Sequence, residues 1–141
     1  MVYIIGAGPG DPELITVKGQ RLLKEADVII YAGSLVNPAL LDYAKADCEI
    51  YNSASMTLGE VIETITAAEQ EGKMTVRLHT GDPAIYGAIQ EQMDELSRRN
   101  IEYTVIPGVS SFLATAAALK QEYTLPEISQ TVIIKLLCVF S

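Results

Sequence analysis

Residues 4–16 read IIGAGPGDPELIT, a short apolar run followed by alternating glycines. A run that ends in such a loop predicts a buried strand whose carboxyl end approaches a ligand closely. The loop is not the dinucleotide fingerprint G-x-G-x-x-G, because Gly6 and Gly8 fit but Asp11 occupies the third glycine position. Its carboxylate would repel a pyrophosphate, and the two prolines of the stretch lack amide donors. The sequence therefore disfavours an NAD-dependent dehydrogenase.

The rest of the chain alternates between strand-like and helix-like segments. Thr57 and Glu60 form a capping box and Gly72 is placed as a C-terminal cap, which predicts a helix between them. The predicted strands cover residues 2–5, 27–31, 49–51, 74–79 and 103–106, and further helices cover 16–25, 86–99 and 110–120, the last of them buried. Regular alternation implies βαβ crossovers. We therefore expect an α/β fold, with a mostly parallel five-stranded sheet and helices on both faces.

Loops rich in small residues follow all five predicted strands. They read GAGPG, AGS, NSAS, TGDP and PGVSS. In a parallel sheet these loops lie along one edge, the carboxyl edge, where open α/β sheets bind their ligands. The pattern predicts a long crevice at that edge, with five ordinary turns as the alternative.

The composition limits the class of protein. Of the 141 residues, 49% are hydrophobic and 20% are charged, as in a folded globular domain. The net charge of −8 argues against sequence-independent binding to nucleic acid or to an anionic membrane, because both need clustered Lys and Arg. No signal-peptide pattern opens the chain, and Cys48 and Cys138 are isolated. We therefore expect a reduced, cytoplasmic protein with neither nucleic acid nor membrane as a partner.

Four stretches together resemble one family of enzymes. They read GAGPGDPELIT at 6–16, YAGSLVNP at 31–38, HTGDPAIYGA at 79–88 and PGVSSFLA at 107–114. In this combination they resemble the tetrapyrrole methylases, which transfer a methyl group from S-adenosyl-L-methionine to a porphyrinoid. The second and third stretches resemble in particular the branch that methylates precorrin-4 or cobalt-precorrin-4 at carbon 11 in cobalamin biosynthesis.

The resemblance also implies where the ligands bind. It implies that two α/β domains enclose S-adenosyl-L-methionine, with this chain as the N-terminal half. The cofactor-binding residues that it implies are Pro9, Thr80, Gly81, Asp82, Ile85, Ser110 and Ser111. The trough for the tetrapyrrole substrate would be lined by Gly6, Gly8, Gly10 and Asp11, and Ser34 and Tyr86 are further candidate substrate contacts.

The sequence assigns no residue a catalytic role. Methyl transfer needs alignment of donor and acceptor, and the chain offers neither a Ser-His-Asp set nor a metal-ligand cluster. Asp11 and His79 are the candidate catalytic groups, His79 either as a general base or as a strand-end histidine bonded to the backbone. Asp82 pairs with the positively charged cofactor or accepts its hydrogen bonds, or it begins a turn through its Asp-Pro dipeptide, and both roles are compatible.

Two other polar residues also have two interpretations, and a third has one. Ser34 and Asn37 either bind carboxylates of the substrate or cap the segment opened by a proline. Arg77 lies inside a predicted strand, which is an unusual place for a charged residue. The structural explanation is that its long side chain extends to a partner carboxylate.

The end of the chain departs from the family pattern. We expect residues 1–131 to form the N-terminal methylase domain and 132–141 to be the truncated start of a C-terminal domain with an atypical tail. TVIIKLLCVF at 131–140 predicts an exposed apolar strand, which a homodimer would cover. A chain that lacks half of the cofactor site should be a weak catalyst by itself. The alternatives are another tetrapyrrole methylase, such as a uroporphyrinogen III methyltransferase, or a non-catalytic porphyrinoid-binding module.

Overall fold

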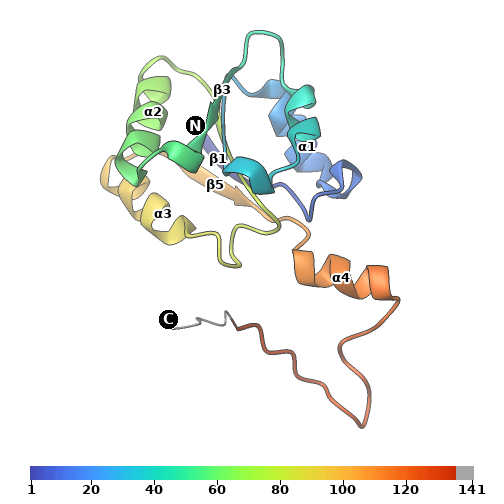
Figure 1. Cartoon of the computed structure of the whole chain (residues 1–141). Coiled ribbons are helices and arrows are strands. Elements are labelled where there is room, and N and C mark those ends of the chain that lie inside the picture. The colour runs from blue at the N-terminus through green and yellow to red at the C-terminus, as the bar shows by residue number, and fades with distance from the viewer. Residues whose placement is uncertain (136–141) are drawn as a thin grey trace. The chain divides into compact units, whose positions relative to one another are not determined.

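The computed structural model describes residues 1–135, which divide into a unit of Met1–Ser111 and a unit that begins at Phe112. The first unit contains a five-stranded sheet in the order β3-β2-β4-β1-β5, and every neighbouring pair of strands is parallel (Figure 1). The strands are β1 (Val2–Gly6), β2 (Val28–Tyr31), β3 (Glu49–Asn52), β4 (Thr75–His79) and β5 (Tyr103–Ile106). The predicted α/β fold with a parallel five-stranded sheet is thus confirmed.

Helices cover both faces of this sheet. Figure 1 shows α1 (Val17–Glu25) on one side and α2 (Leu58–Gln70) with α3 (Ile89–Arg98) on the other. Leu22 and Leu23 of α1 are buried in one core layer, together with the β4 residues Val76 and Leu78. The second core layer joins side chains of α2 and α3 to β1 and β2, and contains Val61, Ile62, Ile65, Leu96, Val2 and Ile30. The alternating side chains of the central strands β1, β2 and β4 therefore face apolar helices on both sides, as a buried parallel sheet requires, whereas all four residues of the edge strand β3 are exposed.

Short 3-10 helices fill several of the connections in this unit. They are η1 (Pro12–Leu14), η2 (Gly33–Leu35), η3 (Pro38–Tyr43) and η4 (Ser53–Ser55). Three of them begin at a capping side chain that accepts a backbone hydrogen bond, as Asx residues do at helix starts: Asp11, Asn37 and Asn52.

Two predictions about helices are wrong, one on where a helix begins and one on the burial of another. α3 begins at Ile89 rather than at residue 86, because Tyr86 (φ 55°) and Ala88 (φ 49°) adopt left-handed conformations that an α-helix excludes. α4 (Ser111–Leu119) is not a buried helix, since Ala116 is its one buried residue within the described part of the chain. Its alanine-rich sequence favours a helix in either environment.

The predicted apolar tail strand begins at 131. Residues 131–135 form no strand, because no described segment pairs with them, and the remainder of the prediction, 136–141, lies outside the described residues. The second unit contains a contact of its own, in which the Tyr123 hydroxyl donates to the carbonyl of Phe112 at 2.5 Å and the two rings stack at 6.1 Å.

The capping box of α2 is formed as predicted, and it gives a test of the fold. The Glu60 amide donates to Thr57 Oγ1 at 3.2 Å, and Glu60 Oε2 accepts from the Thr57 amide at 2.7 Å. Thr57→Ala should lower the free energy of unfolding by about 1 kcal/mol, because the helix loses its N-cap acceptor. Urea denaturation followed by circular dichroism measures this.

The matched control is Thr64→Ala within the same helix. The Thr64 hydroxyl donates to the carbonyl of Glu60, one turn earlier, and caps no free amide. This control should be neutral or slightly stabilising, because alanine has the higher helix propensity. Equal losses in the two variants would contradict the importance of the cap.

Candidate functional site

The loops that follow β1 and β4 are bonded to each other. The Gly8 amide donates to the Gly81 carbonyl at 3.2 Å, and the Gly81 amide donates to the Gly8 carbonyl at 2.8 Å. Both glycines have positive φ, 79° and 57° respectively, so each loop turns sharply and still pairs with the other. The two loops thereby form an isolated antiparallel bridge just beyond the parallel β1–β4 pairing.

Three glycines meet beneath this pair of loops. An ideal Cβ placed on Gly6 would lie 2.5 Å from the Gly81 carbonyl oxygen and 2.7 Å from Gly108 Cα. An ideal Cβ on Gly108 would lie 2.3 Å from the same oxygen. The backbone at the ends of β1, β4 and β5 is thus in direct contact. We call Gly6, Gly81 and Gly108 the glycine junction. The close contacts explain the glycines at positions 6 and 108, whereas the glycine at position 81 is favoured by its positive φ of 57°.

A pocket of about 400 Å³ opens beside the glycine junction, at the carboxyl edge of the sheet. Loops after β1, β2, β4 and β5 contribute to its wall, which confirms the predicted crevice for four of the five loops. A cavity of this size is typical of small-molecule sites. The lining residues are Gly8, Pro9, Leu35, Thr80, Gly81, Asp82, Ile85, Tyr86, Ser110 and Ser111. All seven residues predicted to bind the cofactor are among them.

The residues predicted to bind the substrate divide into two groups. Gly8 and Tyr86 line the pocket, whereas Gly6, Gly10, Asp11 and Ser34 do not. Gly6 is buried in the glycine junction, and Asp11 is exposed and accepts from the Glu13 amide at 2.9 Å. The sequence reasoning missed Leu35, whose side chain is 77% exposed although it follows a buried strand.

Two Asx residues join loops that are distant in sequence. Asp82 Oδ1 accepts from the Ala84 amide at 2.8 Å, and its Oδ2 accepts from the Gly108 amide at 2.9 Å. Asn37 Nδ2 donates to the Gly10 carbonyl at 2.7 Å, and its Oδ1 accepts from the Ala39 amide at 3.0 Å. The capping interpretation of Asn37 and the turn interpretation of Asp82 are confirmed.

Arg77 is a buried cation on the central strand β4. The prediction that it reaches a carboxylate is wrong, because its Nε donates to Gln92 Oε1 at 3.0 Å and its guanidinium donates to the Ile30 carbonyl at 3.1 Å. Gln92 lies on α3, and Arg77 is 6% exposed. Burial lowers the pKa of Arg77 to about 10, so the side chain stays charged at neutral pH.

His79 is buried at the end of the same strand. It is 5% exposed, and its Nε2 has no hydrogen-bond partner within the described residues. Burial, together with the charge of Arg77, lowers the pKa of His79 to about 4, so the imidazole is neutral at pH 7. The side chain does not line the pocket, and the position gives no support to a general base there.

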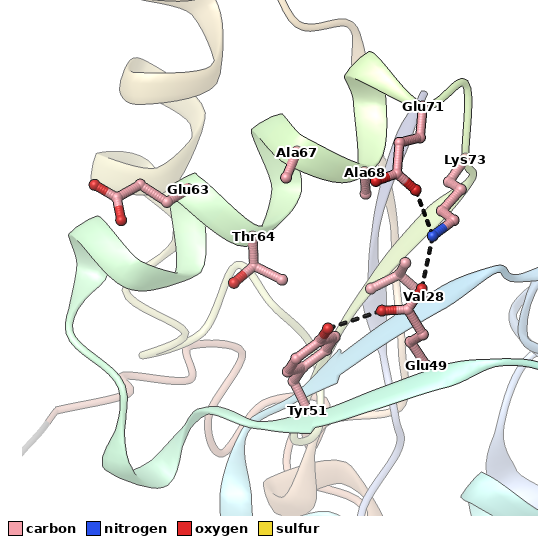
Figure 2. Close-up of a pocket in the computed structure, with 9 residues that line it drawn as sticks. All are labelled: Val28, Glu49, Tyr51, Glu63, Thr64, Ala67, Ala68, Glu71 and Lys73. Carbon is pink, nitrogen blue, oxygen red and sulfur yellow. Dashed lines mark hydrogen bonds and ion pairs between the residues drawn. The ribbon is translucent and has the colours of Figure 1, made fainter.

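A second hollow lies at the opposite edge of the sheet, between β3 and α2 (Figure 2). Three of its four charged side chains, Lys73, Glu49 and Glu71, pair with one another. Lys73 Nζ lies 2.6 Å from Glu49 Oε1 and 2.6 Å from Glu71 Oε2, and the Tyr51 hydroxyl donates to Glu49 at 2.8 Å. These carboxylates accept hydrogen bonds from Lys73 and so raise its pKa. The hollow is a surface charge network rather than the candidate ligand site.

Residues 1–135 contain neither a membrane-spanning helix nor a metal-binding cluster. No helix in this part of the chain is long and apolar enough to cross a membrane. No group of three His, Cys, Asp or Glu side chains in it is arranged to hold a metal ion.

A parallel α/β sheet with glycine-rich loops around a carboxyl-edge pocket defines a class of small-ligand-binding proteins. The family model of the tetrapyrrole (corrin/porphyrin) methylases matches residues 1–137, and the chain belongs to this family. A cobalt-precorrin-4 C(11)-methyltransferase from Methanocaldococcus jannaschii is 65% identical over 133 residues, which cover 94% of this chain and 51% of that protein. The chain thus spans about half the length of the curated relatives it matches.

Two solved structures resemble the fold closely. The X-ray structure of a cobalt-precorrin-4 methyltransferase, a cobalamin biosynthetic enzyme, has a TM-score of 0.92 at 53% identity, over 94% of this chain and 55% of the other. A uroporphyrin-III C-methyltransferase from Thermus thermophilus, complexed with S-adenosylhomocysteine, has a TM-score of 0.70 at 38% identity, over 82% of this chain and 47% of the other.

Proposed function

We propose that this chain forms part of an S-adenosyl-L-methionine-dependent C-methyltransferase that acts on precorrin-4 or cobalt-precorrin-4 at carbon 11. The observation that carries the proposal is the 65% identity, over nearly the whole chain, to a protein named for that reaction. The family's methyl donor is S-adenosyl-L-methionine, and one structural relative is complexed with its demethylated product.

The pocket at the carboxyl edge fits this cofactor in its chemistry. The hydroxyls of Thr80, Ser110 and Ser111 offer hydrogen bonds suited to the amino-acid and ribose parts of the molecule. The side chains of Leu35 and Ile85 offer apolar surface suited to its adenine. Gly8 and Gly81 keep the floor of the pocket free of side chains. We propose that Pro9 and these residues hold the cofactor.

The contribution of the protein to the reaction is alignment and exclusion of water. When bound, the cofactor supplies a methyl group on a positively charged sulfur, which is a good leaving group. The bonded loops of β1 and β4 fix the pocket before the ligand arrives, so little reorganisation is needed on binding. Neither Asp11 nor His79 lines the pocket, and we assign no proton transfer to the residues of this chain.

For the substrate we propose a trough beside the pocket. Tyr86 is 59% exposed at the pocket rim, where its ring can lie against a flat macrocycle. Gly10, Asp11 and Ser34 lie outside the pocket and are proposed as contacts on the wall of that trough. We also propose that the protein acts as a cytoplasmic homodimer, for which sedimentation equilibrium is the test.

Label transfer tests the reaction. The chain is incubated with methyl-labelled S-adenosyl-L-methionine and either precorrin-4 or uroporphyrinogen III. We expect label in precorrin-4 and none in uroporphyrinogen III. The transfer should be slow, because the chain spans half the length of its relatives. Label in uroporphyrinogen III would favour the sibling activity. Porphyrinoid binding without any transfer would favour a non-catalytic module.

A matched pair of serine variants tests the cofactor pocket. Ser110 lines the pocket and is 6% exposed, whereas Ser34 is exposed outside it. Ser110→Ala should weaken binding of S-adenosylhomocysteine about fivefold, as expected for one lost hydrogen bond. Ser34→Ala should leave the affinity unchanged. Chemical-shift titration by NMR measures both affinities even where binding is weak, and equal effects would contradict the assignment of the pocket.

A further inference from the structure

The Asp82 carboxylate is held by two loops. Its Oδ1 accepts from the Ala84 amide in its own loop, and its Oδ2 accepts from the Gly108 amide in the loop after β5. Both oxygens therefore have backbone donors, at 2.8 and 2.9 Å, and the second donor, Gly108, follows Asp82 by 26 residues. Hydrogen bonds from amides to a carboxylate are among the stronger ones in proteins.

This side chain completes a connection that the backbone begins. The loops after β1 and β4 are joined by their own amides and carbonyls at Gly8 and Gly81. The loop after β5 touches them at the glycine junction and is bonded to the β4 loop through the Asp82 side chain. Ser110 follows Gly108 by two residues and lines the pocket. The position of Asp82 thus sets the position of a pocket wall.

We propose that Asp82 is a positioning residue, which holds the loop of Ser110 and Ser111 against the β4 loop and acts on the cofactor through that loop rather than by pairing with its charge. The proposal rests on the proposed function, because it concerns the same pocket. A direct ion pair and a positioning role make different predictions, since S-adenosyl-L-methionine is positively charged at sulfur and S-adenosylhomocysteine is not.

The first experiment needs no ligand. Amide hydrogen exchange is followed by NMR in the full chain and in Asp82→Asn, with Asp94→Asn as a control that removes one negative charge from α3. Asp94 accepts a hydrogen bond from Gln90 on its own helix and bonds to no loop within residues 1–135. Exchange of the Gly108 amide should accelerate at least tenfold in Asp82→Asn and stay unchanged in the control. An unchanged Gly108 amide in Asp82→Asn would overturn the proposal.

The second experiment separates positioning from charge pairing. NMR titrations give the affinity of each variant for S-adenosyl-L-methionine and for S-adenosylhomocysteine. Asp82→Asn should lower both affinities by the same factor, about five- to twentyfold, and Asp82→Glu should not restore them, because the longer side chain misplaces the same charge. A loss that is at least tenfold greater for the charged ligand would overturn positioning and leave the proposed function intact.

Two further outcomes are that Asp82→Asn does not fold and that the wild-type chain binds neither ligand. If Asp82→Asn does not fold, Asp82→Glu gives the same comparison with the charge retained, and recovery of both affinities in that variant would overturn the proposal. If the wild-type chain binds neither ligand, the proposed function fails and the positioning role fails with it. The wild-type titration therefore distinguishes the two failures.

Discussion

Gly108→Ala is expected to lower the free energy of unfolding by about 3 to 5 kcal/mol, enough to unfold a large part of the protein at ordinary temperature. The new Cβ would lie 2.3 Å from the Gly81 carbonyl oxygen and 2.8 Å from Gly6 Cα. Both are backbone atoms, held by the strand ends of β4 and β1, so no side chain can rotate away to make room. Urea denaturation of the full chain measures the loss.

Two other glycines separate this overlap from ordinary effects of replacing glycine. Gly72 has a φ of 71° with nothing within 4 Å of an added Cβ, so Gly72→Ala should lose only about 1 to 2 kcal/mol through its left-handed backbone. Gly59 is exposed in α2, and an added Cβ would lie 3.9 Å from its nearest neighbour, Thr57 Oγ1. Gly59→Ala should therefore raise the free energy of unfolding by up to about 1 kcal/mol. A Gly108→Ala loss no larger than that of Gly72→Ala would contradict the tight contact at the glycine junction.

The sheet and the pocket could be predicted from the sequence because both follow from local patterns. Short apolar runs marked four of the strands and a weaker pattern at residues 49–51 marked the fifth, and the alternation of strands with helices predicted the parallel arrangement. Once the strands are parallel, the loops after them must share one edge. The pocket residues of the β1, β4 and β5 loops follow from that rule together with the family resemblance, and the structure brings the seven expected cofactor residues together.

What could not be predicted depends on one strained turn and on contacts between residues that are distant in sequence. The apolar spacing of 86–99 suits a helix, yet the chain turns tightly before Ile89, where an added Cβ on Gly87 would lie 2.1 Å from the Pro83 carbonyl oxygen. The Arg77 bond to Gln92 joins residues 15 positions apart, and no local signal distinguishes an amide partner from a carboxylate. No sequence pattern predicts the second hydrogen bond of Asp82, to the Gly108 amide, either.

Acid should destabilise the protein through His79. Its pKa is lowered to about 4 in the folded protein, against about 6.5 in the unfolded chain, so the unfolded chain binds more protons between these values. Stability from the neutral imidazole is fully present above pH 6.5 and is lost as the pH falls to 4. At about 1.4 kcal/mol per pKa unit, this loss is about 3 kcal/mol.

The loss of stability in acid has a physical cause, which is that the buried site of His79 does not stabilise a positively charged imidazole. Protonation would place a second cation beside buried Arg77 in a layer where Nε2 has no hydrogen-bond partner among the described residues. His79→Leu removes the titration while other acidic groups of the chain titrate as before. The free energy of unfolding at pH 7.5 minus that at pH 4.5 should therefore be smaller in His79→Leu than in the wild type, by about 2 to 3 kcal/mol.

A direct titration checks the same pKa without unfolding the protein. His79 is the single histidine of the sequence, so its imidazole Cε1 proton gives one assignable NMR signal. In the folded protein the midpoint of that signal should lie near pH 4. A midpoint near 6.5, or equal pH dependence of stability in the wild type and His79→Leu, would show that the imidazole is hydrated. The burial of His79 between β4 and the α2–α3 layer would then be wrong.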